Sequence, residues 1–177
     1  MSKILYIAVA ICLFCTFSMS FDIQSLNDKR LEAYCKKCHI VYPAGLMPSR
    51  SWKKLFSDES LSSHFGESVS LSDDVKKDFL AYYLKYASDI SDNKLARKIN
   101  KSINPSSTPL RISKIPYIED KHKDLTKEMV ILNPKVESFS YCKSCHGAYA
   151  QKGEFEEDDV KIPNYKKVFL LGWIKDD

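Results

Sequence analysis

The chain contains one five-residue pattern twice, Cys-x-x-Cys-His, at residues 35–39 and 142–146. Residues three apart in a helix lie on one face, so both thiols of a pattern can reach the two vinyl groups of one porphyrin. The histidine that follows then places an imidazole nitrogen under the iron. The two patterns therefore predict two covalently attached c-type haems. Their thioether bonds come from Cys35, Cys38, Cys142 and Cys145.

Residues 1–20 have the form of a secretory signal peptide. Lys3 supplies the positive start, residues 4–17 are apolar, and Ser18 and Ser20 stand at the small-residue positions before a cleavage site. The apolar run is short for a bilayer span, which needs roughly 20 residues. We therefore predict a cleaved signal peptide and a periplasmic protein. An uncleaved N-terminal anchor is the alternative.

The cysteines support export with haem attachment. Of 6 cysteines, Cys12 and Cys15 lie in the signal segment, and the other four belong to the two patterns. No cysteine remains for a disulfide, which is unusual for an exported protein unless its thiols have another use. One zinc ion held by the two pairs is the alternative. The pairs are much farther apart than in a zinc finger, and zinc does not require the histidine that follows each pair.

The histidine count predicts the remaining iron ligands. The chain has four histidines, His39, His64, His122 and His146. Two follow the cysteine pairs, which leaves two for two irons. We assign His64 to the first haem and His122 to the second, as bis-histidine sites, and a crossed arrangement stays open. Met47 and Met129 are rival sixth ligands, because haem iron also accepts methionine. Either histidine could instead be an ordinary surface or core residue.

Three further side chains are candidates for binding the haem propionates. Arginine donates two parallel hydrogen bonds to a carboxylate, and an indole N–H donates one. Arg50 and Trp52 follow a proline-rich loop next to the first motif, and Arg111 follows a break at residues 104–109. The alternative for each arginine is a surface position without such a role.

The pattern of apolar residues predicts a mainly α fold, with helices and loops packed around two haems and little or no sheet. A helix over residues 21–39 carries the first motif, with Ser25 or Asn27 as its cap. A second helix starts at Ser49 or Ser51, and a third follows the capping-box-like residues 70–73.

The later part of the chain reads as a second haem-bearing unit. The break at residues 104–109 predicts an N-terminal haem domain over 21–103 and a C-terminal haem domain over 104–177. Residues 110–115 could form a short strand or an extended crossing segment. Asn133 and Pro134 form a strong helix start, and that helix is expected to carry the second motif. The apolar tail 168–173 is expected to dock on the core.

The charge is not that of a nucleic-acid-binding protein. The formal net charge is +4, and most lysines are scattered, so no DNA or RNA partner is predicted. Lysines beside the first motif and around His122 could steer an acidic partner protein. An ordinary solvated face explains them equally well.

Several runs of the sequence resemble the DHC family of dihaem cytochromes c. They are residues 38–52, 64–67, 108–112 and 142–146, with Gly153 and Phe155 after the last. The resemblance implies a periplasmic electron carrier with two bis-histidine haems. It also implies redox partners: an oxygen-binding monohaem cytochrome c that the protein reduces, and a membrane cytochrome b that supplies electrons.

The number of iron ligands predicts the same function on chemical grounds. An iron with two protein imidazoles has no open position, so it changes oxidation state without binding a substrate. We therefore predict an electron carrier and not an enzyme. The alternative is a peroxidase-like enzyme or a gas-binding protein with one open iron. A redox sensor is a third possibility, which the lack of any attached sensor or kinase module makes less favourable.

Overall fold

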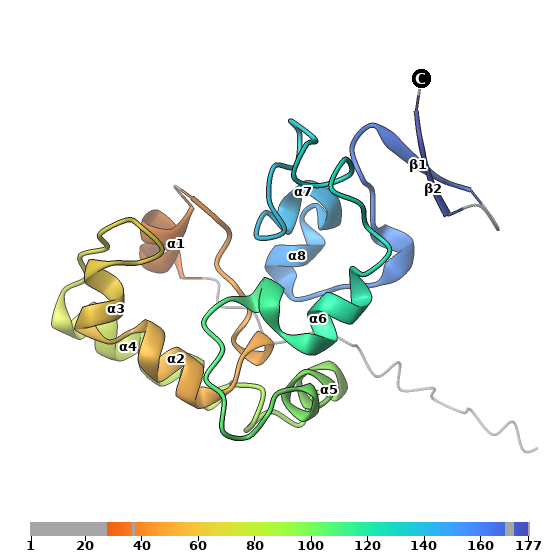
Figure 1. Ribbon diagram of the computed structural model, residues 1–177. Coiled ribbons are helices and arrows are strands. Elements are labelled where there is room, and N and C mark those ends of the chain that lie inside the picture. The colour runs from red at the N-terminus through yellow and green to blue at the C-terminus, as the bar shows by residue number, and fades with distance from the viewer. Residues whose placement is uncertain (1–27, 37, 169–171, 177) are drawn as a thin grey trace, which may run out of the picture.

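The computed structural model describes residues 28–36, 38–168 and 172–176, and these are mainly helical, as predicted (Figure 1). The α-helices are α1 Lys29–Cys35, α2 Ser49–Leu55, α3 Asp58–Ser62, α4 Asp73–Lys85, α5 Lys94–Ser102, α6 Pro116–Lys121, α7 Lys143–His146 and α8 Tyr149–Lys152. Short 3-10 helices are η1 Ala44–Leu46, η2 Ile112–Lys114 and η3 Glu157–Asp159. The antiparallel strands β1 Tyr165–Val168 and β2 Gly172–Lys175 form a hairpin. The predicted signal peptide lies outside the described residues.

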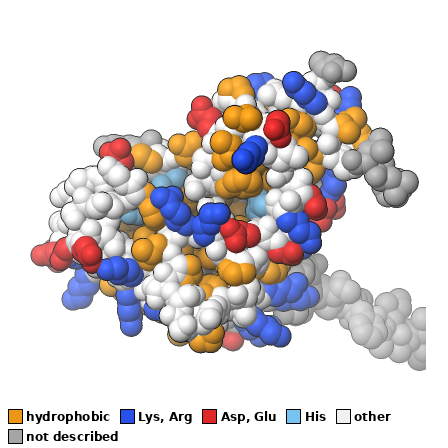
Figure 2. Space-filling model, in the orientation of Figure 1, with side chains coloured by type: hydrophobic (Ala, Val, Ile, Leu, Met, Phe, Trp, Pro, Cys, Tyr) orange, Lys and Arg blue, Asp and Glu red, His pale blue; other side chains and the backbone are white. Residues whose placement is uncertain are grey.

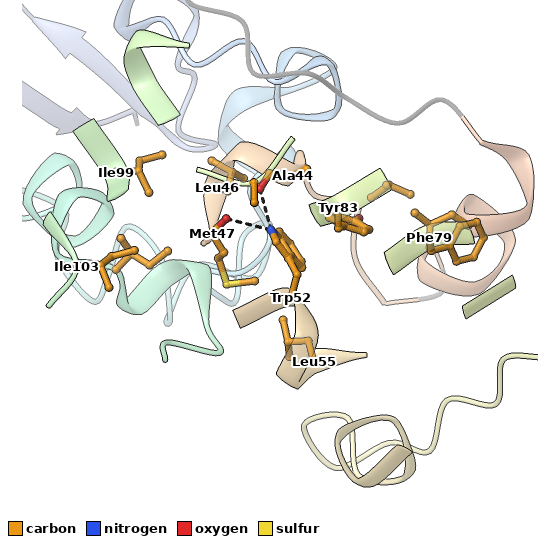
Figure 3. Close-up of a cluster of buried hydrophobic side chains, with 13 residues drawn as sticks. Ala44, Leu46, Met47, Trp52, Leu55, Phe79, Tyr83, Ile99 and Ile103 are labelled. Atoms are coloured by element: carbon orange, nitrogen blue, oxygen red, sulfur yellow. Dashed lines mark hydrogen bonds between the residues drawn. The ribbon is translucent and has the colours of Figure 1, made fainter. Parts of the chain in front are cut away.

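The first core lies between α2, α4 and the loop that carries η1 (Figure 3). The indole of Trp52 packs on the ring of Tyr83, with centroids 4.2 Å apart. Its N–H donates to the carbonyl oxygens of Ala44, at 2.8 Å, and Met47, at 3.1 Å. The proline-rich loop after the first motif therefore folds back onto α2 and is held there from inside the core.

This first core continues past residue 104. Ile115 is fully buried in it, and Leu110, Ile112, Tyr117 and Ile118 pack against it. Figure 1 shows α6 between the bundle of α1–α5 and the part of the chain that carries α7, α8 and the hairpin. The proposed division into 21–103 and 104–177 stays a prediction, but residues 110–118 contribute to the first core.

A second, smaller core supports the second motif. Its buried side chains are Met129, Val130, Val136 and Ile162, and Cys145, Tyr165 and Trp173 are among the side chains packed against it. The backbone N–H of Lys161 donates to the carbonyl oxygen of Cys145 at 2.9 Å. The C-terminal segment thus binds to the motif itself, and Trp173 from the predicted docking tail packs on this core.

Asn133 joins the two ends of this second core. Its amide donates to the carbonyl oxygens of Met129, at 3.2 Å, and Pro163, at 2.8 Å. Its side-chain oxygen accepts the N–H of Lys135, at 3.1 Å, so the residue caps a turn. No helix follows in this part of the described chain, because residues 134–141 form turns and only α7 is helical in the second motif. The prediction of a helix starting at Asn133 was therefore wrong.

Replacing Asn133 with alanine should lower the free energy of unfolding by about 1–3 kcal/mol, because the buried carbonyl oxygen of Met129 and the partly buried one of Pro163 lose their donor. Denaturant unfolding followed by circular dichroism measures this change. Lys135→Ala is the control, since that side chain is exposed and should change stability little. Equal unfolding midpoints for Asn133→Ala and wild type would show that these hydrogen bonds are not structurally important.

Two other local expectations differ from the structure. The described part of the first helix begins at Lys29, and the cap is Asp28, whose carboxylate accepts the N–H of Arg30. The candidate caps Ser25 and Asn27 lie outside the described residues. No strand forms at residues 110–115: Arg111 and Ile115 have extended backbone, and residues 112–114 between them form the 3-10 turn η2. Leu110, Ile112 and Ile115 all contact the first core.

Candidate haem-binding site

Both motifs form one tight helical turn with the same hydrogen bonds. The N–H of His39 donates to the carbonyl oxygen of Cys35 at 3.0 Å, and the N–H of His146 donates to that of Cys142 at 2.8 Å. The first turn extends the C-terminal end of α1, and the second forms α7. The turn places the two thiols and the imidazole of each motif on neighbouring sides of one short segment, as haem attachment requires.

The first histidine pair joins the motif at α1 to a turn that is distant in sequence. The ring centroids of His39 and His64 lie 6.1 Å apart. His64 stands at the start of a tight turn, in which its N–H and carbonyl bond to the carbonyl and N–H of Glu67. The two central residues, Phe65 and Gly66, have φ of 54° and 107°. Positive φ at both central positions is typical of a type I′ turn.

The second histidine pair has the same spacing. His122 lies at the C-terminal end of α6 and His146 ends α7, and their ring centroids are also 6.1 Å apart. The ring of Phe155 lies 5.4 Å from His146, and that of Phe139 lies 6.3 Å from His122. Ile118, His122 and Phe139 line a cleft beside this pair. These apolar and aromatic side chains suit the face of a porphyrin.

The spacing of both pairs fits a metal ion between two imidazoles. A ring nitrogen binds a transition metal at about 2 Å. The ring centroid then lies roughly 3 Å from the metal, so two opposed imidazoles have centroids roughly 6 Å apart. The structure brings His39 to His64 and His122 to His146 at this separation. The residues present therefore fit two bis-histidine haems.

Hydrogen bonds leave the correct nitrogen free on two of these rings. The Nδ1 of His39 lies 2.6 Å from the carbonyl oxygen of Ile40, and that of His122 lies 2.7 Å from the carbonyl oxygen of Ile118. A carbonyl oxygen only accepts, so Nδ1 carries the proton and Nε2 keeps its lone pair for a metal. The Nδ1 of His64 is buried without a hydrogen-bond partner among the described residues.

Burial keeps the remaining two rings neutral. Burial and the neighbouring His122 lower the pKa of His146 to about 4, and burial and His39 lower the pKa of His64. Both effects penalise the imidazolium form. At neutral pH these imidazoles are thus unprotonated at one nitrogen, which is the form that binds iron.

The described surroundings of the motif cysteines do not suit a zinc ion. Among the described residues, no group of three or more His, Cys, Asp or Glu side chains is arranged to hold a metal ion. Burial raises the pKa of the Cys35 and Cys142 thiols to about 11 in each case. Zinc binds cysteine as a thiolate, and these surroundings favour the neutral thiol. The geometry therefore disfavours the zinc alternative.

The predicted propionate donors have other partners in the structure. Trp52 is 4% exposed, and its indole N–H donates to the carbonyls of Ala44 and Met47, so here it holds the loop. Its role as a propionate donor stays a prediction. The Nε of Arg50 donates to the carbonyl oxygen of Ser107 at 2.6 Å, which fastens α2 to the 104–107 loop. Arg111 alone lies at a histidine pair. Its guanidinium is 4.2 Å from the centroid of Phe65, next to His64.

The rival methionine ligands lie in the two cores. Met47 is 1% exposed and packs in the first core with Trp52, as Figure 3 shows. Met129 is one of the buried residues of the second core. His64 faces His39, and His122 faces His146, from the positions that a methionine ligand would need to take.

Sequence reasoning missed Tyr42, which contacts a ligand of the first motif and the loop before the second. Its ring stacks on His39, with centroids 4.7 Å apart and planes 18° apart. Its hydroxyl donates to the carbonyl oxygen of Ser140, at 2.6 Å, in the loop before the second motif. Burial, together with the nearby Cys142 and Cys35 thiols, raises the pKa of Tyr42 well above its usual range. A tyrosine five residues before Met47 in a proline-rich loop gives no sequence signal for these contacts.

Replacing Gly66 with alanine should loosen the turn that presents His64. The φ of 107° disfavours any side chain, and the strain should cost about 1–3 kcal/mol, although an added Cβ meets no atom within 4 Å. The variant should unfold at lower denaturant and lose part of its low-spin spectrum at one haem. Gly172→Ala is the matched control, because that glycine also has positive φ, 72°, but lies in the C-terminal hairpin. A spectral change in the control alone would contradict the prediction.

Comparison with known proteins gives a consistent family. The family model of dihaem cytochrome c, DHC, matches residues 31–155. A solved diheme cytochrome c from Rhodobacter sphaeroides is 33% identical, with a TM-score of 0.62, over 75% of this chain and 99% of that chain. A solved diheme cytochrome type c from Shewanella baltica is also 33% identical, with a TM-score of 0.58, over 74% of this chain and 89% of that chain. No curated protein matches.

Proposed function

Because the chain belongs to the dihaem cytochrome c family, we propose that it is a periplasmic electron carrier in which two histidines ligate each of two c-type haems. Membership of the family means two covalently attached c-type haems and a role in electron transfer. An electron carrier, rather than an enzyme, is consistent with this family. We propose, beyond this, the pairing of the iron ligands, the periplasmic location and the redox partners.

The observation that carries the proposal is the equal 6.1 Å spacing of the two histidine pairs. The haem supplies one-electron iron chemistry, and the protein decides what else can reach the iron. His39 and His64 would hold the first haem, and His146 and His122 the second. With two protein imidazoles on each iron, oxygen, peroxide and carbon monoxide would find no free coordination site.

Other side chains would orient these ligands. The carbonyls of Ile40 and Ile118 fix the rings of His39 and His122, which sets the tautomer and increases the basicity of the ligating nitrogen. Arg111 lies beside the first pair and is the propionate donor that we retain. Cys35 and Cys38 would anchor the first haem, and Cys142 and Cys145 the second.

We place the protein in the periplasm because cytochromes c of this kind are exported and residues 1–20 resemble a cleaved signal peptide. Within the described ranges, no helix is long and apolar enough to cross a membrane. The partners that we propose are an oxygen-binding monohaem cytochrome c as acceptor and a membrane cytochrome b as donor.

The absorption spectrum of the purified holoprotein tests the carrier function. We expect low-spin bands in the oxidised and reduced states, no change when carbon monoxide is added to the reduced protein, and two one-electron steps in a redox titration. Rapid carbon monoxide binding by the wild-type protein would contradict the proposal. It would favour the alternative, an enzyme or gas-binding protein with one open iron.

A further inference from the structure

Tyr42 connects the two haem-binding sites through two different contacts. On one side its ring lies flat on the imidazole of His39, at 4.7 Å and 18°. A ring stacked this closely resists rotation of the imidazole plane, and the Nδ1 contact with the Ile40 carbonyl restrains the same ring from its edge. Tyr42 therefore contributes to the orientation of an iron ligand that it does not replace.

On the other side Tyr42 holds the approach to the second motif. Its hydroxyl donates to the carbonyl oxygen of Ser140, which lies 98 residues further along the chain and two residues before Cys142. The sulfur of Cys142 lies 3.9 Å from that same oxygen. The path from the first iron ligand to the second haem anchor thus contains one ring contact, one short hydrogen bond and two residues of chain.

The position of Tyr42 is itself fixed. Its side chain is half-buried, and its carbonyl oxygen accepts the hydroxyl of Tyr83, at 3.1 Å, from the first core. Pro43 follows it directly and is buried. A residue held from both sides in this way transmits a change of position between the elements that it touches better than a mobile surface side chain would.

We propose that Tyr42 is a positioning residue that couples the two haem sites, since its ring sets the plane of His39 and its hydroxyl holds the segment leading to Cys142. The inference rests on the proposed function, because it assumes that His39 ligates the first iron. In the coupled exchange one iron is oxidised by one electron as the other is reduced. No proton moves, no bond forms or breaks, and Tyr42 stays a neutral phenol.

Two substitutions separate the ring from the hydroxyl. Tyr42→Phe keeps the stacked ring and removes the bond to Ser140. It should slow electron exchange between the haems several-fold in the one-electron-reduced protein, measured by line broadening of the haem methyl NMR signals. Its ferric low-spin EPR signals should stay unchanged. Tyr42→Leu removes both contacts, so it should also shift one of the two EPR signals, because their g-values depend on the angle between the axial imidazole planes.

Two controls separate coupling from general loosening. Tyr83→Phe removes a comparable hydroxyl bond, which ends on the backbone of Tyr42 and does not reach Ser140. Gln151→Ala removes the 2.9 Å hydrogen bond to Glu32, another contact between the two parts of the chain, but neither side chain touches a haem ligand. Gln151→Ala should exchange electrons at the wild-type rate. Tyr83→Phe loosens the backbone of Tyr42 but keeps the bond to Ser140, so it should slow the exchange less than Tyr42→Phe does.

The outcomes decide each part of the proposal. An unchanged exchange rate in Tyr42→Phe, or an equal loss in either control, would overturn the role of the hydroxyl. Unshifted EPR signals in Tyr42→Leu would overturn the role of the ring. Carbon monoxide binding by wild type would overturn the proposed function alone, because the exchange measurement compares two covalently attached haems whatever their sixth ligands are.

Discussion

Replacing His64 with alanine should convert one of the two haems from low-spin to high-spin and raise its reduction potential, while the other haem stays unchanged. If His64 ligates the iron as proposed, its lone pair would stabilise the ferric state, so its loss would favour the ferrous state and open a coordination position. The reduced variant should therefore bind carbon monoxide at one haem. Absorption spectroscopy and redox titration of the holoprotein measure both effects.

The neighbouring residue supplies the control for this experiment. Ser63 is exposed and precedes His64 in the same segment, so Ser63→Ala should leave both haems low-spin. Two low-spin haems in His64→Ala would show that His64 is not a ligand. That result would also reopen the case for Met47, which packs in the first core close in sequence to the first motif.

Replacing Trp52 with alanine should lower the free energy of unfolding by about 3–5 kcal/mol, because a buried indole in contact with Tyr83 is removed and leaves a cavity. Trp52→Phe keeps most of the packing but loses both hydrogen bonds to the η1 loop, which should cost about 1–2 kcal/mol. Denaturant unfolding of the holoprotein measures both changes. Trp173→Phe, in the half-buried hairpin, should cost less.

The haem potentials distinguish this structural role of Trp52 from the predicted role as a propionate donor. If the indole N–H bound a propionate, Trp52→Phe would move the potential of the first haem, since removing a donor to a carboxylate changes the charge that the iron senses. We expect stability to fall and both potentials to stay at their wild-type values. A shifted potential in a stably folded Trp52→Phe variant would support the propionate assignment.

The chemistry of the sites could be predicted from sequence because it depends on short patterns and on a small count. The spacing of Cys35, Cys38 and His39 is a property of a single helical turn, and the structure shows that turn at both motifs. Four histidines for two irons leave few ways of pairing them. The structure then places His39 beside His64 and His122 beside His146.

The partners of Trp52, Asn133 and Tyr42 could not be predicted, because they are set by parts of the chain that come together only on folding. An indole N–H near a haem motif suggests a propionate, but the η1 loop turns its carbonyls inward and reaches it first. Asn133 before a proline suggests a helix cap, but its amide donates to Pro163, 30 residues away. Local patterns contain no information about these distant acceptors.

The expected strand at 110–115 failed for a related reason. Alternating apolar residues predict a strand when one face of a sheet is buried. Here Ile112 and Ile115 both contact the first core, and the turn η2 brings them there without any strand partner. The same burial pattern is thus compatible with two backbone conformations, and here the chain adopts the 3-10 turn, which contacts α6.

The C-terminal segment determines how much of the chain is needed to support the second haem site. The family match ends at residue 155, and by then all four motif cysteines and all four histidines have been supplied. Ile162 and Trp173, which come later, complete the second core, and the N–H of Lys161 binds the carbonyl of Cys145. The shortest stretch that contains every cofactor-binding side chain is therefore shorter than the stretch that builds their support. A chain cut at the family boundary would retain its ligand chemistry and lose part of the scaffold beneath its second haem.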